Sequence, residues 1–108
     1  MVQPSRDEKH FNSILLDILN DVLIQVFGET PAKVILHYMK IRYGLERGRI
    51  PDNLETFSAV LEEILGQNAG LIEGLILRRL SSALELEEPI PNLLDIEKVR
   101  KRLLESES

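Results

Sequence analysis

Apolar residues recur three and four positions apart along most of this chain, which is the spacing of α-helices. The most continuous of these segments is residues 66–84, where Ile72, Ile76 and Leu80 form a row at i, i+4 and i+8. Other apolar residues widen the row, so little of the predicted helix surface is polar. We therefore expect this helix to lie at the centre of the fold, with neighbours on more than one face.

The central segment carries two glycines, Gly70 and Gly74, each costing roughly 1 kcal/mol of helix propensity relative to alanine. One interpretation is that a second helix approaches closely across them. The other is that Gly70 belongs to a loose first turn. The pattern is compatible with both.

Four further segments have helical spacing, at residues 8–27, 31–43, 54–65 and 93–105. A glycine directly follows each of the first three and is a natural C-terminal stop. Thr30 is the predicted cap of the second of these helices, with Pro31 in its first helical position. Asp52 or Asn53 is the predicted cap of the third. No segment shows the alternating pattern of a strand, and no internal repeat or low-complexity tract occurs.

The fold class predicted from these segments is all-α, a compact bundle of four to five helices with short loops. Residues 1–7 are expected to form a flexible N-terminus, and residues 8–86 the helical bundle domain. The segment ELEEPIPN is acidic and holds two prolines. Residues 87–108 are therefore interpreted as a linker and a C-terminal amphipathic helix.

Composition excludes several classes of protein. The chain has no cysteine, which rules out disulfides, thiolate zinc sites and thiol catalysis. Its apolar runs fall well short of the roughly 20 residues of a membrane span, and its start does not resemble a signal peptide. We therefore expect a cytoplasmic protein that does not bind membranes. A net charge of -5 also disfavours nonspecific attraction to nucleic acid.

No constellation of residues predicts catalysis, a metal site or a cofactor. His10 and His37 are not spaced as a ligand pair, and no glycine-rich phosphate loop or nucleophile elbow is present. The chain is therefore predicted not to be an enzyme. Glu73, which is flanked by apolar residues, and Arg78 are the polar residues of the central segment that we would test. A small-molecule pocket between helices, around Tyr38, Tyr43 and Phe57, is the weakest of the functional hypotheses.

The first helix has more apolar surface than a small domain readily hides. Its row is either intramolecular core or the seam of a homodimer. As a candidate protein interface we name Phe11, Leu15, Ile18 and Val22.

The last helix carries a run of cations. The candidate basic contact patch is Lys98, Arg100, Lys101 and Arg102. Such a patch is either a solvated helix flank or a surface that contacts phosphate, which gives the alternative function of a nucleic-acid-associated regulator. Residues 54–84 resemble a helix-turn-helix in outline, but the start of the second helix is too apolar to read DNA.

Residues 28–84 resemble a known type of domain. The resemblance lies in GETPAKVILHYMKIRYGL, then Ile50-Pro51, then LETFSAVLEEILGQNAGLIEGLILRRL. These segments are similar to a small archaeal all-helical domain of uncharacterised function, which also occurs as a C-terminal output module of thaumarchaeal signalling proteins. The resemblance implies a helical fold and a signalling or regulatory role, but no ligand or catalytic residue. We therefore predict a non-enzymatic interaction domain that acts through protein–protein contacts, with itself or with another protein.

Overall fold

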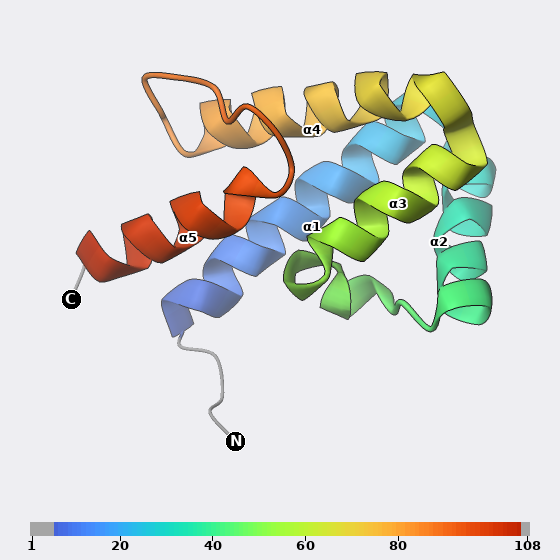
Figure 1. The fold of residues 1–108 in the computed structure, drawn as a ribbon, viewed down its shortest axis with the longest axis horizontal. Helices are drawn as coiled ribbons and strands as arrows, with labels where there is room; N and C mark the ends of the chain where they lie inside the picture. The colour runs from blue at the N-terminus through green and yellow to red at the C-terminus, as the bar shows by residue number, and fades with distance from the viewer. Residues whose placement is uncertain (1–5, 107–108) are drawn as a thin grey trace.

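The computed structural model describes residues 6–106, which form five α-helices and two short 3-10 helices (Figure 1). Their bounds are α1 Arg6–Phe27, α2 Glu29–Tyr43, η1 Arg47–Asp52, α3 Leu54–Leu65, η2 Gly66–Asn68, α4 Ala69–Ala83 and α5 Asp95–Ser106. No strand occurs within the described residues, and the predicted all-α bundle of four to five helices is confirmed. The predicted flexible N-terminus falls largely on residues 1–5, which lie outside the described residues, whereas residues 6 and 7 begin α1.

Helix α1, and not α4, occupies the centre of the bundle. It contacts α2, α4, α5 and η1, and it crosses the molecule between α4 and α5 in the view of Figure 1. Helix α4 packs on α1 and α3 but leaves Gly70, Leu71 and Gly74 exposed. The prediction that α4 is the central helix is therefore wrong. Although α4 is apolar over a wide arc, only part of that arc is covered.

Three helices end at glycines, as the sequence predicts. Gly28, Gly44 and Gly66 all have positive φ angles, which side chains other than glycine rarely adopt. At Gly44 the left-handed conformation lets its N–H donate to the carbonyl oxygen of Lys40. Thr30 is not the cap of α2, because the helix already begins at Glu29. The break between α1 and α2 is thus a single glycine.

The glycines of α4 do not mark a close approach of two helices. A Cβ atom built on Gly70 or Gly74 would meet nothing within 4 Å. Gly70 lies in the first turn of α4, which agrees with the interpretation of a loose start. The close-approach interpretation is wrong, and Gly74 leaves an open notch on the surface of the helix.

The C-terminal helix packs on its own bundle. After α4 ends at Ala83, the chain runs through an irregular acidic segment to α5. The backbone N–H of Ile90 donates to the Ser81 hydroxyl oxygen at 2.9 Å, and this bond is buried. Ile90, Leu93 and Ile96 then join the same hydrophobic core as the residues of α1. None of the helices among residues 6–106 is both long and apolar enough to span a membrane.

Candidate functional site

The four residues named as a dimer seam on α1 lie mainly inside the bundle. Phe11, Leu15 and Val22 are buried in the hydrophobic core, and Ile18 is half-buried against it. Helices α2, α4 and α5 all contact α1 within one chain, and the four residues belong to the hydrophobic core or pack against it. The prediction that this row is a protein interface is therefore corrected for the three buried residues, because they have no surface left to offer a partner.

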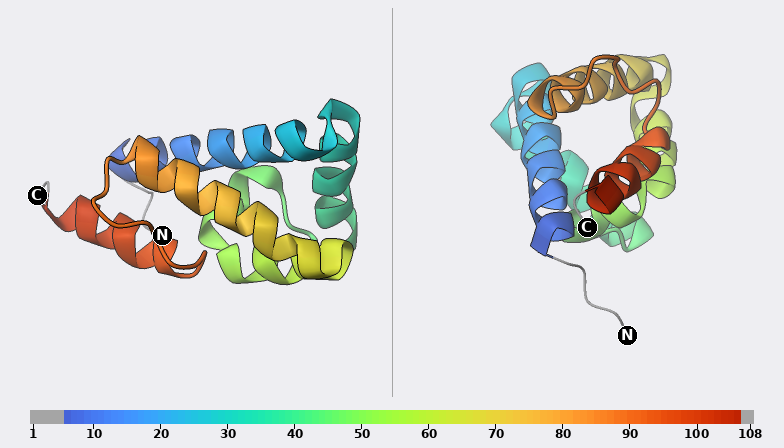
Figure 2. Two further views of the ribbon diagram at one scale, coloured as in Figure 1. Left: turned by 90° about the horizontal axis from the view of Figure 1, so that it is seen from above. Right: turned by 90° about the vertical axis from the view of Figure 1, so that its left-hand side faces the viewer.

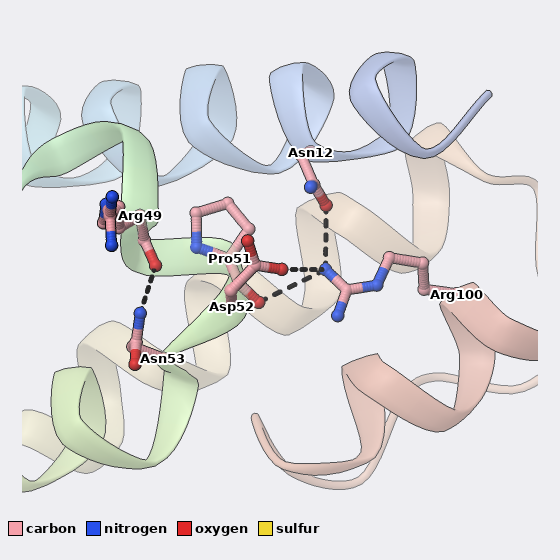
Figure 3. A network of polar contacts seen from close by, with 6 residues as sticks. All are labelled: Asn12, Arg49, Pro51, Asp52, Asn53 and Arg100. Carbon is pink, nitrogen blue, oxygen red and sulfur yellow. Dashed lines mark hydrogen bonds and ion pairs between the residues drawn. The ribbon is translucent and has the colours of Figure 1, made fainter. Parts of the chain in front are cut away.

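Arg100, one of the four residues of the predicted basic patch, points inward (Figure 3). Its Nη1 donates to Asn12 Oδ1 at 2.8 Å and to the carbonyl oxygen of Pro51 at 3.2 Å. The Oδ1 atom of Asp52 lies 3.7 Å from the same nitrogen. The guanidinium carbon also stands 6.0 Å from the centroid of the Phe11 ring. Arg100 thus ties α5 to α1 and η1, and its place in a surface patch is a second correction.

The other three cations of α5 remain at the surface. Lys98, Lys101 and Arg102 are exposed and are spaced i, i+3 and i+4, so they share one face of the helix. Lys98 makes an exposed ion pair with Asp95 at 3.7 Å. Arg100 falls on the opposite face, four residues after the buried Ile96, which is why the structure separates it from the other three.

The remaining residues that the sequence singled out do not form a common site. Glu73 is half-buried and accepts a hydrogen bond from the Ser58 hydroxyl, so it has a structural partner on α3. Phe57 is fully buried, whereas Tyr38 and Tyr43 lie at the surface, so these three do not line one cavity. Among the described residues, no group of three or more His, Asp or Glu side chains is arranged to hold a metal ion.

The most prominent exposed apolar surface is on α2. Its Ala32, Ile35 and Met39 are buried, as expected for one face of a helix. A second set of apolar side chains, however, points to solvent. Val34 is 61% exposed, Tyr38 38% and Ile41 70%. At 3.6 residues per turn these three lie within roughly 60° of arc, so they form a continuous row, which we call the α2 stripe.

Basic side chains border the α2 stripe on both edges. His37 borders one edge, with Lys33 and Lys40 in the next row beyond it, and Arg42 borders the other edge. Lys33 pairs with Glu29 at 3.3 Å, and this pair is well exposed. Within residues 6–106, no carboxylate lies within ion-pair distance of Lys40. Helix α2 therefore has a net positive surface in a chain whose overall charge is -5.

Tyr38, the middle member of the α2 stripe, contacts a second aromatic residue near the end of the helix. The rings of Tyr38 and Tyr43 meet edge to face, with their centroids 6.1 Å apart. The guanidinium carbon of Arg42 lies 5.7 Å from the centroid of the Tyr43 ring. These contacts hold large side chains in place at the surface. Helix α2 forms one end of the fold, and it occupies an edge of the molecule in two perpendicular views (Figures 1 and 2).

A second apolar surface is a groove between the end of α1 and the start of α4. It encloses about 610 Å³ and is lined by Val26, Leu71 and Leu75 together with Gly70 and Gly74. Arg78 stands at its rim. The groove carries fewer charged residues than the exposed face of α2, because Arg78 is the single ionisable residue in its lining.

No family model, no curated protein and no solved structure matches the chain. The resemblance to archaeal helical output domains therefore stays a prediction.

The apolar spacing predicts one helical segment at residues 31–43 without separating a buried from an exposed apolar row, and so it misses the α2 stripe. The signal is present in the sequence, because Val34, Tyr38 and Ile41 form one helical row and Ala32, Ile35 and Met39 form another. Which of two such rows is buried depends on where the neighbouring helices lie.

Proposed function

We propose that this chain is a non-enzymatic interaction domain that binds another protein through the exposed face of α2. The observation that carries the proposal is the α2 stripe, in which three large apolar side chains at i, i+4 and i+7 lie together at the surface. Rows with this spacing are the anchors by which one helix packs on another. Single exposed apolar residues are ordinary on protein surfaces, whereas a contiguous row of large apolar side chains that includes an aromatic ring is typical of a binding surface.

The proposal moves the interaction surface away from α1, because the α1 residues are used for the core. A signalling or regulatory role, as implied by the resemblance, is compatible with such a domain. A protein of this kind would act by bringing its partner to another part of a signalling complex.

A matched pair of substitutions tests this function. Ile41 and Leu71 are exposed to almost the same extent, 70% and 69%, but lie on different surfaces. We expect Ile41→Glu to abolish the recovery of partners from extract of the native host cells, with Leu71→Glu leaving recovery unchanged. Chemical crosslinking followed by mass spectrometry identifies the partners in both cases. Equal recovery by wild type and Ile41→Glu would contradict the proposal.

The alternative function, a nucleic-acid-associated regulator, now depends on three exposed cations of α5. Lys98, Lys101 and Arg102 share a face and could contact phosphates, whereas the buried Arg100 could not. If this alternative is correct, mobility-shift assays at low salt show that the protein binds nucleic acid. The double variant Lys101→Glu, Arg102→Glu should lose this binding. Binding should also weaken steeply with added salt, because phosphate contacts release counterions.

A further inference from the structure

We propose that the partner of α2 is an amphipathic helix whose apolar row is flanked by acidic residues. This inference rests on the proposed function, because it names the chemistry of the partner that would bind the α2 stripe. Two features of α2 carry it: the spacing of the apolar row and the sign of the charges on either side of that row.

The spacing of the row selects a helix as the partner. Val34, Tyr38 and Ile41 repeat at intervals of four and three residues, which is the seam of helix-on-helix packing. From Val34 to Ile41 the seam is roughly 10 Å long at 1.5 Å per residue. A partner helix of two to three turns, with apolar residues at i, i+4 and i+7, is long enough to cover it.

The charges beside the row select an acidic partner. On one side His37 borders the row, with Lys33 and Lys40 in the next row beyond it, and Arg42 borders the other side. The only acidic residue of α2 is Glu29, which pairs with Lys33, so α2 keeps a surplus of cations. In helix pairs, the residues that flank the apolar seam decide which partner is accepted. A partner with glutamate or aspartate on both flanks would place opposite charges along both edges of the contact.

The same charges argue against a second copy of this chain as the occupant. If two α2 helices paired antiparallel about a two-fold axis, the side carrying His37, Lys33 and Lys40 would face its own copy. If they paired in parallel, this side would face Arg42 of the other copy. Either arrangement brings like charges together, which disfavours association.

The side chains of the row also favour a protein over a single-stranded nucleic acid. Surfaces that bind single strands offer aromatic rings for base stacking together with cations. Tyr38 and Tyr43 could serve in that way, but the two most exposed members of the row, Val34 and Ile41, are aliphatic. Branched aliphatic side chains have no flat face for a base to stack on, whereas they pack well against leucine or isoleucine of a helix.

The test uses two designed peptides with the intact protein. Both peptides are helical and carry leucine at i, i+4 and i+7. One has glutamate at all flanking positions, and the other has lysine there. Isothermal titration at low salt should show that the acidic peptide binds at least about tenfold more tightly than the basic one. The difference should shrink as salt is added, because exposed charges are screened.

Charge-reversal variants then test whether the cations of α2 cause the preference for the acidic peptide. Lys33→Glu with Lys40→Glu should abolish the preference for the acidic peptide or invert it. The matched control is Lys98→Glu with Lys101→Glu, which changes the net charge by the same amount on α5. We expect this control to keep the preference, and circular dichroism of both variants checks that the helices remain folded. An equal loss in both variants would overturn the assignment, since it would trace the preference to overall charge.

Other outcomes separate this inference from the proposed function. If Ile41→Glu abolishes recovery of the native partner but the wild-type protein prefers neither peptide, the function stands and the acidic partner is wrong. If the basic peptide or a single-stranded DNA 12-mer binds more tightly than the acidic peptide, the inference is also overturned. Sedimentation equilibrium that shows a dimer disrupted by Ile41→Glu would instead assign the α2 stripe to a second copy. Loss of acidic-peptide binding in Leu71→Glu but not in Ile41→Glu would move the site to the groove beside α4.

Discussion

At Arg100, a cation that the charge pattern assigns to solvent is held between three parts of the molecule. Arg100 is only 7% exposed, and its guanidinium group contacts Asn12 on α1 and Pro51 and Asp52 at the end of η1. A buried charge is stable only when hydrogen bonds replace its water shell. Arginine can do so here because its planar group presents several donors in fixed directions.

Replacing Arg100 with methionine should therefore destabilise the fold. The change keeps a long apolar side chain but leaves the buried carbonyl oxygen of Pro51 without its donor. We expect the free energy of unfolding to fall by about 1–3 kcal/mol, the usual range for hydrogen bonds to charged groups. Urea denaturation measures it. Arg102→Met is the control, since Arg102 is exposed on the same helix and should change stability by less than about 0.5 kcal/mol. Equal midpoints for the two variants would contradict the structural role of Arg100.

At the scale of single elements, glycine has opposite effects on stability at two positions. Gly44 ends α2 with a φ of 66°, a conformation that costs energy for any residue with a Cβ. Gly74 lies inside α4, and a Cβ there would meet open space. The first glycine is required by the backbone, whereas the second weakens a helix that could hold alanine.

Two alanine substitutions should thus change stability in opposite directions. Gly74→Ala should raise the free energy of unfolding by about 0.5–1 kcal/mol, because alanine is the better helix former and no neighbour obstructs it. Gly44→Ala should lower it by about 1 kcal/mol, because alanine is strained in the left-handed region. Thermal and urea denaturation of both variants measure the two effects. A loss of stability in Gly74→Ala would mean that α4 does not tolerate a side chain at its notch.

Local signals of this kind are the part of the fold that the sequence predicts well. The helix stops at Gly28, Gly44 and Gly66 depend on backbone geometry within a few residues, and all three are found where expected. The Arg100 contact was missed because its partner Asn12 lies 88 positions away along the chain. The α2 stripe was missed for a related reason. Its residues are recognised by periodicity, but whether they are covered depends on helices far away in the sequence.

At the scale of the whole molecule, the C-terminal segment completes the core that α1 organises. Leu93 is 3% exposed and its neighbour Leu94 is 54% exposed, so adjacent leucines face the core and the solvent. Ile90 and Ile96 enter the same core. Each fully buried side chain of this kind contributes roughly 1.5–3 kcal/mol, a large fraction of the stability of a small domain.

Truncation after Leu86 should consequently prevent cooperative folding. The shortened chain would expose core residues of α1 and would lose the Arg100 contacts. We expect a broad, low-temperature melt by circular dichroism in place of a sharp transition. In the full chain, Leu93→Ala should cost about 2–4 kcal/mol, with Leu94→Ala as a nearly neutral control. A truncated protein that melts as sharply as the full chain would mean that residues 8–86 fold on their own.

The edge-to-face tyrosines at the end of α2 also make the protein its own spectroscopic reporter. The sequence contains two tyrosines and no tryptophan, so tyrosine emission comes from Tyr38 and Tyr43 alone. Tyr38 belongs to the α2 stripe and contacts Tyr43; both residues are partly exposed, and neither is in the hydrophobic core. Emission should therefore respond strongly to a molecule that docks on α2 and only weakly to changes inside the bundle. Binding to this face can be followed in unlabelled protein with any partner that lacks tryptophan and tyrosine.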